Sequence, residues 1–341
     1  MSEMKGFIED TTEKILKDLS TKESRERFEE GEWSSKLWST VQESGLTLLG
    51  IEEERGGVGG DLEDIFSILR IAGKHAAALP LAEVIFANQF LAGQEGEVED
   101  KLRILHFNED GKDILDHVPY ARYVEEIILV TKNRYYTMEP TVIQTAENLA
   151  AEPRDSVRCV KKEAHMLSGS FEELKKEYER YLAMSRVAMM TGAMESVLAL
   201  SVFYSKERQQ FGRPLHRFQA IQHHLTAMAG EVAAAFATLE ATIKAYSKDT
   251  LGERVAMAKI ELSANANVVA KAAHQLHAGI GMTYEHELHH FTRRLWSWRE
   301  EAGNETYWAN HLADIYLARE ESIWESITEV KGVGANVGSI I

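Results

Sequence analysis

Three residues in the C-terminal third of the chain have the types and the spacing of a hydrolytic zinc site. His286, Glu287 and His290 form the pattern H-E-x-x-H, in which two histidines one helical turn apart bind zinc and the glutamate acts as base. A third ligand would have to come from nearby, and the candidates are Glu301, Glu305 and His311. Because so short a pattern often matches by chance, a polar helix face is the favoured interpretation and a zinc hydrolase the less favoured one.

A second candidate site combines cations, an aromatic ring and the start of a helix. Residues 208–215 join two expected helices and contain Arg208, Phe211 and Arg213. Free backbone N–H groups at a helix start, together with guanidinium groups, suit a diphosphate. Taken alone, the segment is more simply a solvated turn between helices. The small residues of 275–283, which end the next expected helix but one, allow a planar ligand or a second backbone to come close.

The elements that position these groups fall into three parts. Four of the five prolines lie between residues 80 and 153 and separate two regions that favour helices. We expect an N-terminal helical domain over residues 1–92, with helices over 7–19, 37–45, 61–73 and 80–91. A short middle β domain follows over residues 93–168, with strands over 102–107, 126–131, 135–138 and 157–160.

The third part, residues 169–330, has helical periodicity over long stretches. Four long helices are expected, over residues 174–204, 219–246, 254–277 and 305–330. Helices of this length with short connections predict an antiparallel four-helix bundle, followed by a tail over residues 331–341. The predicted fold class is therefore mainly α with a small β domain.

Composition narrows the possible partners and the compartment. The formal net charge is -16, so nucleic acid would meet a repulsive field over most of the surface. The single cysteine, Cys159, cannot form an intramolecular disulfide, and residues 1–19 mix charged and apolar residues, unlike a signal peptide. We expect a cytoplasmic protein with no nucleic-acid partner and no membrane insertion.

Taken together, these motifs resemble the acyl-CoA dehydrogenase family of flavoenzymes. Residues 208–212, 218–222 and 275–283 occur in that family's order and at about its spacing. The N-terminal half is also similar, in the helix and glycine turn of residues 37–60 and in the β-domain segments 118–121 and 148–153. The resemblance covers nearly the whole chain, and its C-terminal motifs are the most specific.

The resemblance implies an oligomer that binds FAD across subunit boundaries. Two helical domains flank a β domain in the family, and the bundles pair dimers into tetramers. Arg208 would hold the FAD diphosphate, while Phe211, Phe218 and Gln219 would line the same cofactor. The adenosine half of an FAD bound mainly by the neighbouring subunit would contact Gln275, Leu276, His277, Ala278 and Gly279.

The resemblance also implies a reaction and a base. A glutamate removes the α-proton of an acyl-CoA, flavin takes the β-hydride, a 2-enoyl-CoA forms, and an electron-transferring flavoprotein commonly reoxidises the flavin. An ungapped count places Ala302 at the position of that glutamate, and a shift of one residue brings Glu301 there. The alternative base position, on the first bundle helix, falls on Leu182, with Glu179 one turn away. Glu301 is thus the candidate base. The alternative, which we weigh equally, is that Glu300 and Glu301 are a solvated charge pair beside Arg299 with no catalytic role.

Two departures from the family pattern suggest a second hypothesis. The middle domain is short, and it lacks the tryptophan that normally packs against the flavin. Some family members, notably those that act on sterol side chains and other bulky acyl groups, consist of two different subunits, one of which lacks the base. The run of residues 294–299 resembles that branch. The chain is therefore either an acyl-CoA dehydrogenase of lipid catabolism or an accessory subunit that completes a partner's flavin site.

Overall fold

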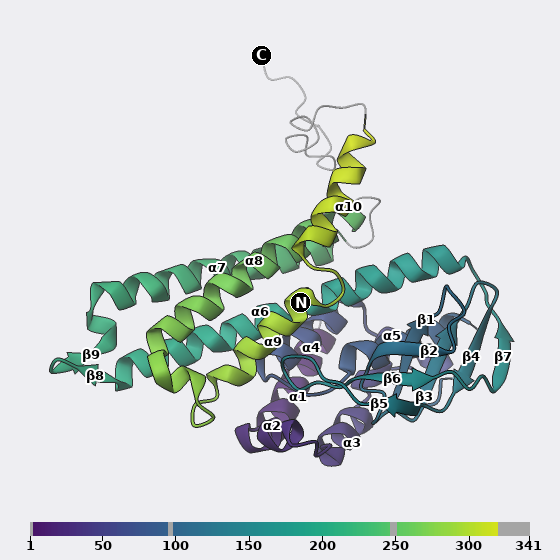
Figure 1. Ribbon diagram of the computed structural model, residues 1–341, viewed down its shortest axis with the longest axis horizontal. Helices are drawn as coiled ribbons and strands as arrows, with labels where there is room; N and C mark the ends of the chain where they lie inside the picture. Colours follow the sequence, from purple (N-terminus) through teal and green to yellow (C-terminus); the bar gives the residue numbers. More distant parts are fainter. Residues whose placement is uncertain (1–2, 95–97, 246–250, 320–341) are drawn as a thin grey trace.

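The fold is given by a computed structural model that describes residues 3–94, 98–245 and 251–319. Five N-terminal helices form one side of the molecule: α1 (Glu3–Leu19), α2 (Lys22–Glu29), α3 (Ser35–Glu43), α4 (Leu62–Lys74) and α5 (Leu81–Gly93) (Figure 1). Asp61 and Asp64 form a reciprocal capping box that starts α4 where the sequence predicts. The four expected helices are present. Helix α2 was not expected, because its charged sequence contains a single apolar residue, Phe28.

The β module has two small sheets. The strands are β1 (Arg103–Phe107), β2 (Ile114–Pro119), β3 (Glu126–Val130), β4 (Arg134–Met138), β5 (Thr141–Gln144), β6 (Arg154–Arg158) and β7 (Glu163–Met166). They are ordered β1-β3-β4-β7 and β2-β6-β5, and β1 pairs with β3 in parallel while the other pairs are antiparallel. The strand expected over residues 157–160 is β6, which begins and ends earlier, at Arg154 and Arg158. Its start was missed because the buried, charged Asp155 interrupts the apolar pattern. Strands β2, β5 and β7 escaped prediction because at least half of the residues in each strand are exposed.

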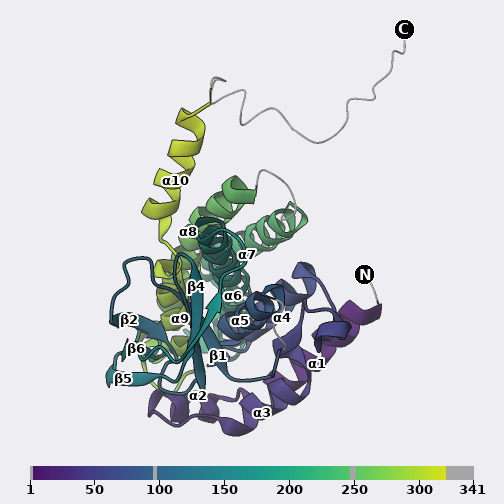
Figure 2. The same ribbon diagram turned by 90° about the vertical axis from the view of Figure 1, so that its right-hand side faces the viewer.

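Five helices follow: α6 (Phe171–Glu207), α7 (Gln219–Lys244), α8 (Leu251–His277), α9 (Leu288–Glu300) and α10 (Glu305–Leu317). Long α6 runs from the β module to the opposite end of the molecule, where a small hairpin of β8 (Gln209–Gln210) and β9 (Arg213–Pro214) connects it to α7 (Figure 1). Figure 2 views the molecule from the end at which the β module lies. The mainly helical fold with a central β module and a C-terminal helical domain is confirmed.

Two expectations about this bundle need correction. Helix α10 ends at Leu317 rather than continuing toward residue 330, and the remainder of that span and the expected tail, residues 320–341, lie outside the described residues. The short helix α9 was not among the four expected long helices, since its histidines and arginines obscure an apolar period. Many of those polar side chains are nevertheless buried, including His290 and Arg294.

Helix α6 packs against both the N-terminal helix α4 and the C-terminal helices α7, α8 and α9. It crosses α4 so closely that a Cβ added to Gly192 would lie 1.8 Å from the Arg70 carbonyl oxygen, and one on Gly73 1.9 Å from that of Met189. Among the described helices, α6 alone has the length and composition of a membrane span, with a mean hydropathy of 1.5. Because 56% of that window is buried inside the fold, packing against α4 and α8 accounts for its apolar character.

Candidate active site and cofactor surface

A cavity of about 630 Å³ lies where the β module meets α6 and the turn after α9. Its wall includes apolar side chains from β1, β2 and α6, namely Leu105, Pro119, Tyr178 and Leu182. Glu301 and Ala302 also line it. The two positions at which the resemblance places a base, Ala302 and Leu182, therefore face the same cavity as the candidate Glu301.

The turn between α9 and α10 sets the position of Glu301. Glu301 is extended and follows the last residue of α9, and then Ala302 and Gly303 adopt left-handed conformations with φ of 54° and 86°. Such a φ costs about 1–2 kcal/mol for alanine and little for glycine. Asn304 then caps α10 by accepting a hydrogen bond from the Tyr307 N–H. This sharp reversal directs the Glu301 side chain into the fold, where it is 20% exposed.

Both oxygens of Glu301 are held by cationic or polar donors. Oε1 accepts hydrogen bonds from Asn148 Nδ2 at 2.9 Å and from Arg154 Nε at 3.0 Å, and it also contacts Arg154 Nη2. Oε2 accepts a hydrogen bond from Arg186 Nε at 2.9 Å. The carboxylate thus joins the β module, which supplies Asn148 and Arg154, to the middle of α6.

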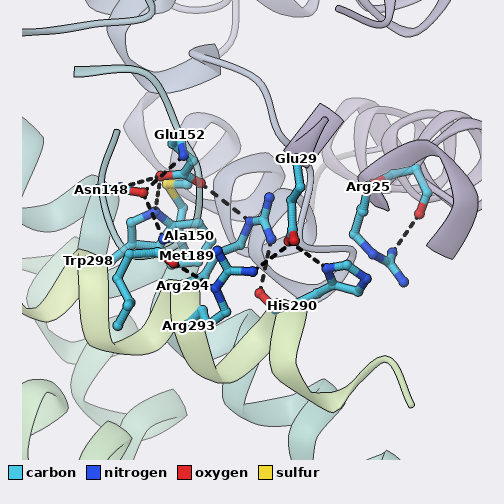
Figure 3. Close-up of polar contacts among 12 residues, drawn as sticks. Arg25, Glu29, Asn148, Ala150, Glu152, Met189, His290, Arg293, Arg294 and Trp298 are labelled. Carbon is cyan, nitrogen blue, oxygen red and sulfur yellow. Dashed lines mark hydrogen bonds and ion pairs between the residues drawn. The ribbon is translucent and has the colours of Figure 1, made fainter. Parts of the chain in front are cut away.

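The ion pairs continue on both sides of Glu301. Arg186 Nη2 donates to Oε1 of buried Glu83 at 2.5 Å. On the other side, Glu152 Oε2 accepts from Asn148 at 2.9 Å and from the Trp298 indole N–H at 3.2 Å, and its Oε1 lies 3.3 Å from Arg294 Nε (Figure 3). The network therefore ties the N-terminal helices, the β module and α9 together.

These contacts make Glu301 a weak base. Burial by itself raises the pKa of this carboxyl group, but Arg154, Arg186 and the hydrogen bond from Asn148 outweigh burial and hold the pKa at about 2. A general base works best with a pKa near the operating pH, which for a glutamate means a raised value of about 6–7. The arrangement suits a permanently ionised counter-ion better than a proton acceptor.

The other carboxylates that line the cavity are also paired. Glu83 pairs with Arg186, Glu147 lies 3.0 Å from Arg122, and Glu300 lies 3.8 Å from Arg299. The charge pair expected beside Arg299 thus exists for Glu300, which is 59% exposed, but not for Glu301. Glu179, one turn from Leu182, is not among the residues that line the cavity.

The expected diphosphate site lies at the far end of α6. Arg208 follows the last residue of α6, is exposed, and makes no side-chain ion pair within the described part of the chain. Phe211 is 93% exposed at the tip of the β8–β9 hairpin, and the Arg213 guanidinium lies 4.1 Å from the ring centroid of Phe218. Gln219 begins α7, whose first N–H groups have no side-chain cap. Cations, aromatic rings and free donors therefore gather on one surface.

The residues expected to meet the adenosine half divide into two groups. Gln275, Ala278 and Gly279 are exposed, whereas Leu276 and His277 are 3% and 1% exposed. His277 stacks on Tyr204 of α6, with ring centroids 4.5 Å apart, so this segment lies beside the end of α6 that carries Arg208. Only the exposed members have a surface that a cofactor or another subunit can reach without rearrangement.

One chain does not bring its cofactor surface to its own cavity. Arg186 and Arg208 lie on and just beyond the same helix, 22 residues apart, which is roughly 33 Å at the rise of an α-helix. Figure 1 shows the hairpin and the β module at opposite ends of the molecule. A ligand held by Arg208 would therefore lie far from the cavity of the same chain.

The H-E-x-x-H pattern does not form the expected zinc site. Helix α9 begins only at Leu288, so His286 and Glu287 precede it. His286 Nδ1 accepts a hydrogen bond from the Leu288 N–H, and Glu287 pairs with Arg25 at 2.6 Å. The expected spacing of one helical turn between the two histidines is therefore absent, and the zinc hydrolase interpretation is wrong.

Sequence reasoning missed the two arginines that determine the chemistry of Glu301. Arg186 is the only charged residue in the buried stretch of α6 from 183 to 194, and an arginine in such a position requires a partner. Arg154 directly follows the segment 148–153 and begins β6. The isolated Arg186 could have been noticed in the sequence as a buried charge that requires a partner. That Arg186 and Arg154 both contact Glu301 follows only from the fold.

Comparison with known proteins identifies the family. Residues 179–317, which include α7, α8, α9, α10 and the Arg208 segment, match the family described as "Acyl-CoA dehydrogenase, C-terminal domain". Residues 179–317 therefore belong to the acyl-CoA dehydrogenase family. The resemblance read from residues 208–222 and 275–283 is thereby confirmed.

Relatives within the acyl-CoA dehydrogenase family match most of the chain. "Acyl-CoA dehydrogenase IpdE2" of Mycolicibacterium smegmatis is 27% identical over 309 residues, which are 86% of this chain and 93% of that protein. Among solved structures, the ChsE4-ChsE5 complex from Mycobacterium tuberculosis has a chain with a TM-score of 0.81 and 16% identity, covering 94% of this chain and 99% of that one. The structure of a steroid acyl-CoA dehydrogenase, Tcur3481-Tcur3483, has a TM-score of 0.80 and 19% identity. The match covers 92% of this chain and 97% of that one. At these identities the solved structures establish the fold alone.

Proposed function

We propose that this chain is the subunit without a catalytic base in a hetero-oligomeric, FAD-dependent acyl-CoA dehydrogenase. Its partner is a related subunit that carries the glutamate base. This chain contributes Arg208, the β8–β9 hairpin and the start of α7 to the diphosphate half of the partner's FAD. The complex carries out α,β-dehydrogenation of an acyl-CoA, for which FAD supplies the hydride acceptor.

The observation that carries the proposal is the double guanidinium clamp on Glu301. Ala302 and Leu182, at the two family base positions, have no ionisable group. Glu301 is therefore the remaining candidate, and its pKa of about 2 is some four units below the range in which a glutamate base works well. The position and charge of this carboxylate favour a structural role.

The exposed cofactor surface supports the second half of the proposal. FAD fits there because a diphosphate needs guanidinium and N–H donors, and Arg208 and the uncapped start of α7 offer both. The aromatic rings of Phe211 and Phe218 add a surface for planar groups. Since this surface lies roughly 33 Å from the cavity of the same chain, it suits a cofactor shared with another subunit.

The names of similar proteins agree with a two-subunit enzyme. The ChsE4-ChsE5 structure is a complex of two differently named chains, and the Tcur3481-Tcur3483 structure is described as a steroid acyl-CoA dehydrogenase. By analogy we propose a bulky acyl-CoA of lipid or steroid catabolism as substrate. A cytoplasmic location, a tetramer, and an electron-transferring flavoprotein as acceptor complete the proposal.

The test compares flavin content with and without the partner. The chain is purified alone and after co-expression with a related acyl-CoA dehydrogenase subunit that has its glutamate. Flavin released on denaturation is counted against protein. We expect the chain purified alone to contain little flavin and to show no dehydrogenase activity. The complex should contain flavin and should be active. One flavin per chain with turnover in the absence of a partner would overturn the proposal in favour of a self-sufficient dehydrogenase.

Arg208→Gln locates the shared site within that complex. The change removes one charge-assisted contact to the diphosphate, worth about 1.5–3 kcal/mol, so FAD affinity should fall by roughly 10- to 100-fold. Arg254→Gln, which changes another exposed arginine, on α8, is the matched control and should leave FAD affinity unchanged. Equal flavin affinity in both variants would contradict the assigned role of Arg208.

A further inference from the structure

The cavity beside Glu301 has a volume of about 630 Å³ that the proposed function does not use, because the base and the FAD belong to the partner. A pocket of this size is within the range that binds small molecules. Part of its wall is formed by buried or half-buried apolar and aromatic side chains, those of Leu105, Tyr178, Leu182 and Trp296. The Tyr178 hydroxyl has no free hydrogen, because it donates to the Leu105 carbonyl oxygen at 2.9 Å. This part of the wall suits an apolar ligand.

The charged side chains inside the cavity already neutralise one another. Arg186 pairs with Glu83 and with Glu301, and Arg154 also pairs with Glu301. Two guanidinium groups thus face two carboxylates within the wall. A charged ligand would find no free counter-ion there, and burying an unpaired charge is strongly unfavourable. The interior therefore favours a neutral ligand.

The exposed rim of the cavity carries carboxylates. The side chains of Glu147 and Glu300 are 45% and 59% exposed, and they pair with Arg122 and Arg299, neither of which lines the cavity. No lysine is among the described residues that line it. A CoA thioester brings a diphosphate and a further phosphate, which bind best to guanidinium or ammonium groups. Because it would meet two carboxylates here, the rim disfavours acyl-CoA and other polyanions.

His106 is a polar group of the cavity wall whose ring has no hydrogen-bond partner in the described part of the chain. It lies on β1, and burial lowers the pKa of its ring to about 4. The imidazole is therefore neutral at pH 7 and offers one N–H donor and one nitrogen acceptor. The Asn148 amide, in contrast, already donates to Glu152 and Glu301. A hydroxyl or carbonyl group can satisfy His106 without bringing a charge into the cavity.

We propose that this cavity binds a neutral, largely apolar alcohol or ketone, held by the apolar wall and by one hydrogen bond to His106. The inference rests on the proposed function, which assigns the acyl-CoA and the FAD to the partner's cavity. The ligand is not the substrate of the dehydrogenation and leaves the site unchanged. Because it binds where the β module meets α6, it should stabilise the folded chain.

The test uses three probes with the same apolar chain and different end groups, namely decan-1-ol, decanoate and decanoyl-CoA. Binding to the full-length chain, purified alone, is measured by isothermal titration calorimetry below the micelle concentration of each probe. We expect decan-1-ol to bind at one site per chain, and the two charged probes to bind at least tenfold more weakly.

The outcomes separate this inference from the proposed function. No saturable binding of decan-1-ol would overturn the inference and leave the proposed function standing. Tighter binding of decanoyl-CoA than of decan-1-ol would also overturn it. If that tighter binding came with one flavin per chain, the proposed function would fall as well.

Two variants and one control locate the site. Leu182→Trp places a larger side chain in the cavity and should abolish binding of decan-1-ol. His106→Phe keeps an aromatic ring but removes the hydrogen bond, and it should weaken binding by about 2- to 12-fold. His223→Phe makes the same change at an exposed histidine of α7, outside the cavity, and should leave binding unaltered. Equal affinity in His106→Phe and His223→Phe would refute the role of His106, whether or not Leu182→Trp folds.

Discussion

The structural role of Glu301 makes Glu301→Gln the most informative single substitution. Glutamine keeps the shape of the side chain and can still accept hydrogen bonds, but it removes the charge that faces Arg154 and Arg186. Two guanidinium groups then share the cavity wall with Glu83 and Glu152 as their remaining buried carboxylate partners. The variant therefore tests whether Glu301 holds the fold together or takes a proton from a substrate.

The magnitude follows from the pKa of Glu301. A fall from 4.5 in the unfolded chain to about 2 in the folded one is a difference of about 2.5 units, or about 3 kcal/mol of folding free energy at neutral pH. Removing one member of a buried ion pair costs about 3–5 kcal/mol, which is consistent. For a chain of this length the melting temperature should fall by about 4 °C.

The same shift predicts the form of acid unfolding. Because the folded pKa lies below the unfolded one, this stabilisation is complete above about pH 4.5 and is lost as the pH falls toward 2. The Glu301→Gln protein lacks that contribution. Its unfolding free energy should consequently fall less steeply than that of the original protein between pH 4.5 and 2.

Urea unfolding at pH 7 and across the acid range measures both effects. Glu300→Gln is the matched control, since its carboxylate is 59% exposed and pairs loosely with Arg299, and it should change stability by less than about 1 kcal/mol. Dehydrogenase activity of the reconstituted two-subunit complex is followed in parallel. Unchanged stability with activity abolished would refute the counter-ion argument and restore Glu301 as the base.

Two further predictions concern buried groups in the helical region. Lys259 donates to the Trp298 and Arg299 carbonyl oxygens at 3.1 and 2.7 Å, and burial lowers its pKa to about 7. Since the unfolded chain binds that proton more tightly, unfolding free energy should rise between about pH 7 and 10.5, and Lys259→Met should abolish this rise in denaturant titrations. Gly192→Ala should cost at least about 1–3 kcal/mol by urea unfolding, because its Cβ would meet the Arg70 carbonyl oxygen at 1.8 Å. Gly230→Ala, with nothing within 4 Å, should not destabilise the protein, and equal losses in the two variants would contradict this account.

The long amphipathic helices were predictable because their stability depends on a local, repeating pattern. Helix α7 begins at Gln219 and α8 ends at His277, as the apolar period indicates. Helices α2 and α9 were missed because Arg25 and Arg294 are buried through partners far away in sequence, Glu287 and Glu152. Local periodicity carries no information about such partners.

In the candidate site, too, some features follow from the local sequence and others depend on residues far away in the chain. Counting along the chain was enough to bring Glu301, Ala302 and Leu182 to one cavity, because the family's helices keep their register. The chemistry of Glu301 depends instead on Arg154 and Arg186, which come from a strand and from the middle of α6. Position was therefore readable from the sequence, whereas basicity required the three-dimensional arrangement.

The buried network also argues against easy recovery of a base by substitution at Ala302. Three arginines, Arg154, Arg186 and Arg294, face three carboxylates, those of Glu83, Glu152 and Glu301. A fourth carboxylate at residue 302 would enter a wall whose charges already balance. Since an uncompensated buried charge is strongly unfavourable, it would compete with Glu301 for the same arginines or remain protonated. A new base at this position would require the loss of Glu301 as well, and with it the contact that joins the β module to α6.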